Sequence, residues 1–457
     1  MTTQTTLDVT QIIEKQKLRG FVVRLIALSL FITMFDGFDM QVIAYAAAYL
    51  THDFHLSRVE MGNLFSIGMF GTMLGGFLFG YLGDRFGRRP AILTAATSFG
   101  ILTFAFAFCN SYTALMVVRF VNGVAIGGLL PLCWALNIEY VSSKYRATVV
   151  TIVMLGYTVG SSLGAPITIW LAPKYGWEAV YMFGGVGTLF ATALLFLFLP
   201  ESARFLAGKG QRPDLIAKYL RRLAPDENIP DNAVFIVSDE GTTKPDRFRV
   251  SKLFEGDLRW ITTLLWIAYI AGSSAVFFKS TWTPLVLEIM GYSRTQAAVF
   301  SSLSALGSAA GGLMLMRFTD KKGPISIAIM GAMSIPLLLY VGLANVGMWT
   351  FLIINFMVNI VMGGAHYGMH SIAGIFYPSV YRANGAGWAT SIAKFGSIAG
   401  PVIGGFILAS SFPVRHIFAL LAISPAILAI SLFTMSRIRA RHTRRADIAA
   451  APAIEPA

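Results

Sequence analysis

The chain has 457 residues, of which 55% are hydrophobic and only 13% are charged. Average soluble proteins carry about 25% charged residues, so this composition excludes an ordinary soluble domain. The mean hydropathy of +0.65 indicates that lipid is the solvent for much of the chain. The two cysteines, Cys109 and Cys133, lie within apolar stretches, where we expect small core residues and no disulfide framework.

Twelve apolar stretches are long enough to cross a bilayer as helices, because one crossing needs about 20 mostly apolar residues. The first six stretches cover about 22–50, 61–83, 90–109, 113–139, 148–172 and 178–199. A charged segment follows, at 200–258. The last six stretches cover about 260–290, 294–316, 324–344, 347–375, 384–410 and 415–435.

These stretches predict an all-α membrane protein with two six-helix bundles, 1–199 and 259–436. The segment 200–258 is expected to link the bundles on the cytoplasmic side. Within it, the amphipathic stretch PDLIAKYLRRLA (213–224) is expected to lie on the membrane surface or under a bundle. Residues 437–457 are expected to form a disordered cytoplasmic tail.

Lysine and arginine are distributed unequally between the two sides of this layout. An even number of crossings puts both termini on one side, and nearly all basic residues outside the spans lie on that side. The other side carries only Arg58, Lys174, Arg294 and Arg415. The positive-inside rule therefore places both termini and the linker in the cytoplasm. The net charge of +13 follows from this bias, so no nucleic-acid partner is expected.

The two sets of six spans repeat each other at a constant offset of 236 residues. This offset aligns Gly75–Gly76 with Gly311–Gly312, Asp84 with Asp320, and Arg146 with Arg382. One unbroken register through five spans is hard to produce by glycine-rich composition alone. Two similarly oriented halves predict a central site between them, near the middle of the membrane.

Ionisable residues gather in the loops that follow spans two and four. The segment GYLGDRFGRRPAIL (80–93) places an acid among arginines. The segment EYVSSKYR (139–146) begins with an acid and ends with an arginine. Positive-inside charge explains the arginines but not the acids. We expect a cytoplasmic gate whose ion pairs lock one conformation and release in another. Its predicted residues are Asp84, Arg85, Arg88, Arg89, Glu139, Arg146, Asp320 and Arg382.

The first span carries two acids, Asp36 and Asp39, on one helix face. A charge inside a span costs at least about 2.5 kcal/mol on insertion scales, so each acid needs a physical reason. Two carboxylates close together in a low dielectric resist joint ionisation, so one of them can carry a proton. We expect proton coupling by Asp36 and Asp39. The alternative is that one of them only pairs with a basic residue.

Three cations inside spans are candidates for holding an anionic substrate: Arg119, Lys279 and Lys394. The alternatives are that Arg119 is the structural partner of Asp36 or Asp39, and that the lysines extend toward an interface. Trp388 lies near these positions and is expected to stack on a planar ligand, although packing alone would also explain it.

Span ten carries a polar stripe made of Asn355, Asn359, His366 and His370. At about 100° per residue, these side chains fall within about 60° of one another on the helix. We expect the stripe to face a watery substrate cavity, although hydrogen bonds across a dry helix interface are the alternative. Metal binding by the two histidines is not expected, because no carboxylate or cysteine accompanies them.

Several of these motifs resemble those of a known family. GYLGDRFGRRP resembles the loop between helices two and three of the major facilitator superfamily, and RFVNGVAIGG (119–128) its helix-four motif. PESARFL (200–206) resembles a feature of its sugar-porter-like branches. DGFD (36–39) is similar to the helix-one signature of the aromatic acid:proton symporter family. In the second half, the loop motif is degraded to MRFTDKKG (316–323).

The resemblance implies the major facilitator fold and supports both aspartates as essential. It implies uptake of a small aromatic or related unsaturated carboxylate, coupled to protons, across the inner membrane. The chain is expected to work by alternating access as a monomer with no cofactor and no metal. It is not expected to be an enzyme, because GxxxxGK[ST] and HExxH are absent from the sequence.

Two alternative functions remain at this point. A proton-driven efflux antiporter of the same fold would carry a Gly-x-x-x-Gly-Pro-x-x-Gly-Gly run in span five. Span five has the imperfect GYTVGSSLGAP (156–166), whereas the full run occurs in span eleven as GSIAGPVIGG (396–405). A membrane sensor that binds the acid without transport is the second alternative, and no recognisable signalling domain supports it.

Overall fold

The computed structural model describes residues 6–230, 233–238, 250–256, 258–322, 324–377 and 382–450. Within these ranges, the side chains of 147, 316–322, 370–371, 373–375, 382–384 and 439–450 are not described. Three predicted site residues, Asp320, His370 and Arg382, therefore lie outside the described side chains.

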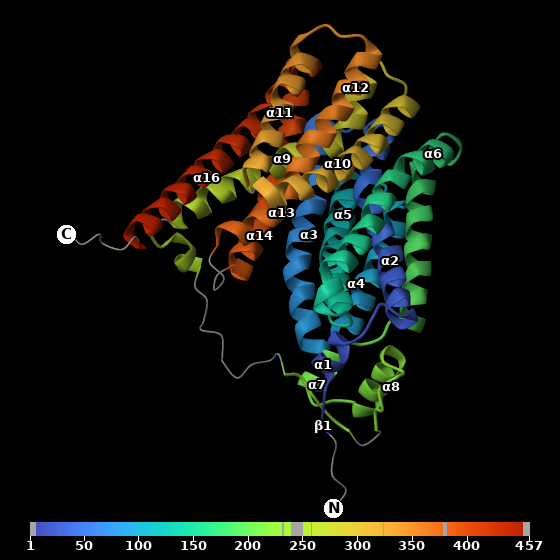
Figure 1. The fold of residues 1–457 in the computed structure, drawn as a ribbon. Helices are drawn as coiled ribbons and strands as arrows, with labels where there is room; N and C mark the ends of the chain where they lie inside the picture. The colour runs from blue at the N-terminus through green and yellow to red at the C-terminus, as the bar shows by residue number, and fades with distance from the viewer. Residues whose placement is uncertain are drawn as a thin grey trace, which may run out of the picture. The chain divides into compact units, whose positions relative to one another are not determined.

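The chain divides into two compact units. Unit 1 comprises Met1–Ser57 and Ile67–Pro245, and unit 2 comprises Arg58–Ser66 and Asp246–Ala457. The long helices of unit 1 are α2 (Gly20–Asp53), α4 (Arg88–Phe106), α5 (Tyr112–Ile138) and α6 (Arg146–Phe198), and α3 (Arg58–Phe86) belongs mostly to this unit (Figure 1).

Helix α6 contains the predicted spans five and six, which meet without a loop. Gly176 breaks the helix with φ of +79° and ψ of 169°, a conformation that side chains with a Cβ rarely adopt, and Pro173 lies just before it. Eleven helices among the described residues are long and apolar enough to cross a membrane. Because α6 crosses twice, they account for the twelve predicted crossings, and the all-α membrane fold is confirmed.

Unit 2 follows the same order. Its long helices are α9 (Leu258–Ile289), α10 (Arg294–Lys322), α11 (Pro324–Leu343), α14 (Arg382–Ala409) and α16 (Ile423–Ala450), and the short α15 (Ile417–Leu421) precedes α16. Span ten consists of α12 (Met348–Val358), a π-helical turn (Asn359–Gly363) and α13 (Gly364–Phe376). Helix α16 continues past residue 437, where the sequence predicts a disordered tail.

Equivalent glycine contacts in the two units confirm the internal repeat. A Cβ on Gly75 would lie 2.0 Å from the Val124 carbonyl oxygen, and one on Gly311 would lie 1.9 Å from that of Ile360. Both residues of the second contact follow the first by the same offset that aligns the two halves. Gly160 against Met34 and Gly396 against Ile270 repeat this correspondence, with distances of 1.7 and 2.2 Å. Backbone contact through small residues is how membrane helices pack closely.

The N-terminus and the linker build a small structure at one end of unit 1 (Figure 1). Strand β1 (Thr6–Asp8) pairs in parallel with β2 (Val234–Ile236), although no strand is predicted from the sequence. Helices α1 (Val9–Glu14), α7 (Ala203–Gly208) and α8 (Pro213–Leu223) pack together beside them. The predicted amphipathic stretch is α8, which buries Ile216, Ala217, Leu220 and Leu223 under the bundle.

Candidate functional site

A buried ion pair joins two of the predicted residues within unit 1. Arg119 Nη1 of α5 lies 2.6 Å from Asp39 Oδ2 of α2, and the side chains are 2% and 1% exposed. Arg119 Nη2 also approaches the Asp39 backbone oxygen at 3.4 Å. The structure therefore shows the alternative arrangement, in which Arg119 pairs with one of the two aspartates.

Two neutral donors complete the surroundings of Asp39. The Thr103 hydroxyl of α4 donates to Asp39 Oδ1 at 2.9 Å, and Asn122 Nδ2 of α5 donates to the same oxygen at 3.2 Å. Three helices thus converge on one carboxylate, which accepts hydrogen bonds on both oxygens. Sequence reasoning missed Thr103 and Asn122, although Asn122 lies one helical turn from Arg119 within the quoted helix-four motif.

The position of Arg119 depends on a glycine of the neighbouring helix. A Cβ on Gly68 of α3 would lie 2.9 Å from Arg119 Nε and 3.3 Å from its Cγ. Nε itself has no hydrogen-bond partner among the described residues, and neither does the buried Tyr181 hydroxyl of α6. Tyr181 interacts electrostatically with both Arg119 and Asp39. The guanidinium therefore keeps one N–H donor, at Nε, without a hydrogen-bond partner among the described residues.

Asp36 is also buried, at 3% exposure, but it lies near different residues of α5 than Asp39 does. Its carboxyl group interacts electrostatically with Cys133 of α5, about three helical turns beyond Asn122 on that helix. The shared helix face predicted for the two aspartates thus places them against different parts of α5.

In unit 2, Lys279 of α9 is the buried cation, with 3% of its surface exposed. Its Nζ lies 3.4 Å from the Asn355 carbonyl oxygen, and no carboxylate contacts it among the described residues. Asn359 Nδ2 donates to the same carbonyl at 2.8 Å, and the Ser308 hydroxyl donates to the Asn359 carbonyl at 3.2 Å. Lys279 of span seven and the two asparagines of the span-ten stripe are therefore brought together.

The π-helical turn changes the predicted stripe. It occupies Asn359–Gly363, between the asparagine and histidine parts of the stripe, and a π turn does not rotate by 100° per residue. The stripe is therefore not the regular face predicted from sequence. His366 is half-buried and points toward Gly272 of α9, where a Cβ would lie 3.8 Å from its Nδ1.

Trp388 and Lys394 both lie on α14. Trp388 is 40% exposed and stacks on Trp266 with ring centroids 6.3 Å apart. Lys394 is half-buried, and its carbonyl accepts a hydrogen bond from Ser397 at 2.7 Å. Their predicted role in binding substrate stays a prediction. No group of three or more potential metal-ligating side chains occurs in the part of the chain that the structure describes.

Three residues of the predicted gate meet at one end of unit 1, and we call them the gate cluster. Arg88 Nη1 lies 2.5 Å from Asp84 Oδ1, and Arg88 Nε lies 3.1 Å from Glu139 Oε1. The Asp84 side chain is 74% exposed whereas that of Arg88 is 17% exposed. Ion pairs at such a partly solvent-exposed surface are individually weak, so a conformational change can break and re-form them.

The start of α4 is capped by Glu201, an acid in the segment between α6 and α7 that the predicted gate does not include. Glu201 Oε1 accepts hydrogen bonds from the backbone N–H groups of Arg88 and Arg89, at 2.9 and 3.2 Å. Burial raises the pKa of Glu201 above its ordinary value of 4.5, and the backbone donors oppose this rise. The quoted PESARFL segment contains Glu201, so the signal was present in the sequence.

The other predicted gate residues contact different partners. Arg89 donates to the carbonyl oxygens of Leu199 and Phe196, which binds it to the end of α6. Arg85 donates to the Tyr81 hydroxyl of its own helix and lies outside the gate cluster. Arg146 was expected to join Glu139.

Arg146 instead pairs with Glu14 of α1 at 2.9 Å. The Glu14 carboxylate also accepts hydrogen bonds from the backbone N–H and hydroxyl of Ser143. These bonds to Ser143, together with Arg146, lower the pKa of Glu14. The N-terminal segment thereby fastens the loop between α5 and α6, a contact that no local sequence pattern indicates.

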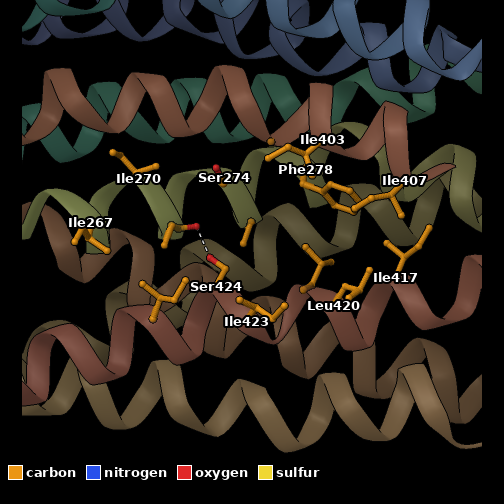
Figure 2. A pocket seen from close by; sticks show the side chains of 15 residues that line it. Ile267, Ile270, Ser274, Phe278, Ile403, Ile407, Ile417, Leu420, Ile423 and Ser424 are labelled. Carbon is orange, nitrogen blue, oxygen red and sulfur yellow. Dashed lines mark hydrogen bonds between the residues drawn. The ribbon is translucent and has the colours of Figure 1, made fainter. Parts of the chain in front are cut away.

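Unit 2 also contains an apolar cavity of about 470 Å³ between α9, α14 and α16, shown in Figure 2. Its two serine hydroxyls already donate to backbone carbonyls, Ser274 to Gly396 at 3.0 Å and Ser424 to Ala271. The remaining side chains that line it are apolar, among them Ile267, Ile270, Phe278, Ile403 and Leu420. Because no donor is left to meet a carboxylate, this cavity is not a site for an organic anion.

Comparison with known proteins agrees with this architecture. The family model described as Major Facilitator Superfamily matches residues 29–366. A gallate transporter of Pseudomonas putida is 31% identical over 96% of this chain and 97% of its own length. The 4-hydroxybenzoate transporter PcaK of Acinetobacter baylyi is 29% identical over 91% of both chains.

Among solved structures, the xylose transporter XylE from E. coli, in a partially occluded inward-open conformation, matches with a TM-score of 0.68. It is 16% identical and covers 91% of this chain and 98% of its own, so it supports the fold alone. The family match covers most of the chain and the gallate transporter is similar along nearly all of it. The chain therefore belongs to the Major Facilitator Superfamily, and it is similar to the aromatic acid transporters within it.

Proposed function

We propose that this transporter imports a small aromatic carboxylate together with a proton across a bacterial inner membrane. Transport proceeds by alternating access in a monomer whose two termini lie in the cytoplasm. Relatives named for gallate, 4-hydroxybenzoate and benzoate support the substrate class. The observation that carries the proposal is the buried ion pair between Asp39 and Arg119.

The charge balance of this pair gives a reason for coupling. Arg119 stays protonated at any relevant pH, so its buried guanidinium requires one negative charge beside it. Asp39 supplies that charge in the observed state. When Asp39 takes up a proton, the guanidinium needs another anion, and a substrate carboxylate can provide it. One proton and one carboxylate therefore bind together more readily than either binds alone.

Lys279 is suited to holding a carboxylate in unit 2. It is buried and its amino group contacts only a backbone carbonyl, at 3.4 Å, among the described residues. A buried ammonium ion without a counter-charge is costly, so an anionic ligand that reaches it gains a strong electrostatic attraction. In this proposal Asn355 and Asn359 position Lys279 through the shared carbonyl.

The gate cluster supports alternating access. Arg88 bridges Asp84 and Glu139 across the ends of three helices, and Glu201 joins the same helix start to the end of α6. Exposed ion pairs contribute about 0–1 kcal/mol each, so a rearrangement of the bundle can break them at little cost.

The test is uptake of labelled gallate, 4-hydroxybenzoate and benzoate with and without a proton gradient. The wild type should accumulate at least one of them, and only with the gradient. Asp36→Asn and Asp39→Asn should abolish accumulation while membrane levels stay normal. Asp53→Asn, at the exposed outer end of the same helix, is the matched control and should transport normally. Full accumulation by both buried-site variants would refute proton coupling by these acids, and net efflux from whole cells would favour the antiporter.

A further inference from the structure

A second buried polar cluster lies between α2 and α5, away from the ion pair of Asp39. It consists of Ser29, Cys133 and Asn137, which are at most 1% exposed. None of these residues belongs to the predicted gate or binding set. Their polar atoms sit in the interior of a membrane-spanning bundle, where an unsatisfied hydrogen-bonding group is costly.

Asn137 has an incomplete set of hydrogen bonds. Its Nδ2 donates to Ser29 Oγ at 2.7 Å and to the Cys133 carbonyl at 2.8 Å, which uses both amide protons. Its Oδ1 has no hydrogen-bond partner among the described residues, although the residue is 0% exposed. In folded proteins such a buried acceptor is usually satisfied by an ordered water.

The cluster connects Asp36 to the gate cluster. Ser29 precedes Asp36 by seven residues in α2, so the two side chains lie on one face of that helix, and the Cys133 thiol interacts electrostatically with the Asp36 carboxyl group. At the opposite end, Asn137 lies two residues before Glu139, which pairs with Arg88. Asn137 is in the last turn of α5, so the cluster lies along the interface of α2 and α5 between Asp36 and the end of unit 1 that carries the gate cluster.

We propose that Ser29, Cys133 and Asn137 hold a buried water that carries protons between Asp36 and the gate-cluster end of unit 1. The inference rests on the proposed function, which includes Asp36 among the proton-coupling acids, because it assigns the route by which a proton held by Asp36 leaves. In the transfer, the O–H bond of the Asp36 carboxyl group breaks and the proton binds the water oxygen. The water then releases a proton to the solvent at the gate-cluster end, and Asp36 is left ionised.

The first experiment separates proton release from substrate movement. Asn137→Leu removes the unpartnered oxygen while keeping the volume of the side chain. It should lower gradient-driven uptake of labelled 4-hydroxybenzoate by about tenfold or more, as expected when a positioned proton-transfer group is lost. Exchange of labelled for unlabelled 4-hydroxybenzoate should stay at the wild-type rate, because exchange needs no net proton release.

The matched control is Thr188→Val in α6. It also removes a buried polar group, a hydroxyl that donates to its own helix at Gly184, but it lies outside the cluster. Both assays should be unchanged in this variant. An Asn137→Leu protein that takes up substrate at the wild-type rate would overturn the inference, as would one that loses uptake and exchange together.

The second experiment tests the water without using transport. In a Cys109→Ala background, Cys133 is the only thiol in the chain. The infrared S–H stretching band then reports how fast that single thiol exchanges its proton for deuterium. Exchange should be fast in this background and at least about tenfold slower when Asn137→Leu is added, because the water that delivers deuterium is lost. Slow exchange in both proteins would show a dry cluster and overturn the inference.

The two proposals fail in distinguishable ways. If the wild type transports no aromatic carboxylate, the proposed function is wrong, while the deuterium exchange of Cys133 still reports on the water. If the wild type transports with protons and Asn137→Leu behaves identically in both assays, only the proton route is wrong.

Discussion

The ion pair between Asp39 and Arg119 predicts how much stability each side chain supplies. Both side chains are almost fully buried, so neither charge can be solvated after its partner is removed. Removing one partner of a buried pair typically costs about 3–5 kcal/mol, whereas replacing both is often neutral. Arg119→Leu should therefore destabilise unit 1 by about 3–5 kcal/mol. The double variant Asp39→Asn, Arg119→Leu should recover most of this loss.

The assay is thermal unfolding of purified protein in detergent. The fraction that stays folded after heating is measured by size-exclusion chromatography. At about 2–4 °C per kcal/mol for a unit of this size, Arg119→Leu should lower Tm by about 10 °C. The double variant should lie within a few degrees of the wild type. The control is a double-mutant cycle on an exposed pair, Arg212 with Asp214, which should show no coupling free energy between the two changes. If the two changes at Asp39 and Arg119 destabilised additively, the pair would not be the mutually compensating unit described here.

Three further predictions concern neighbouring contacts. Glu201→Ala leaves two backbone N–H groups uncapped and should destabilise unit 1 by about 1–3 kcal/mol, with Glu201→Gln intermediate, measured by Tm. The lowered pKa of Glu14 stabilises the docked N-terminal segment above pH 4.5, and this contribution should fade as the pH falls through the folded-state pKa. Proteolysis of residues 6–15 should therefore accelerate in acid, and Glu14→Gln should abolish that dependence. Gly68→Ala should displace Arg119 and reduce uptake of labelled 4-hydroxybenzoate, whereas Gly80→Ala, which meets no atom within 4 Å, should not.

The fold could be predicted from the sequence because the length and hydropathy of a stretch are enough to identify a membrane-spanning helix. All twelve predicted crossings correspond to helices, and the offset that aligns the halves reappears as equivalent glycine contacts. The details that escaped prediction are those without a local signal. The π-helical turn at Asn359–Gly363 leaves no mark in composition, so the polar stripe was assigned a regular rotation that it does not have.

The sequence could predict which residues belong to the candidate site, but not which of them contact one another. Asp39 and Arg119 were both identified from their cost in lipid, yet the sequence left open which acid Arg119 contacts. Pairing depends on the rotation of α2 against α5, which the separate helices do not encode. The same reason explains why Arg146 was expected to join Glu139 when it contacts Glu14 instead. Long-range partners are set by tertiary packing, and of the missed residues Asn122 and Glu201 had a visible signal, because both lie in quoted motifs.

The parallel pairing of β1 with β2 has a consequence for the order of events during synthesis. Strand β1 contains Thr6–Asp8 and must wait for Val234–Ile236 before it can pair. By then the ribosome has made every helix of unit 1. The strand pair can therefore close only after all the helices of unit 1 have been synthesised, and its formation ties the N-terminus to the end of the first bundle.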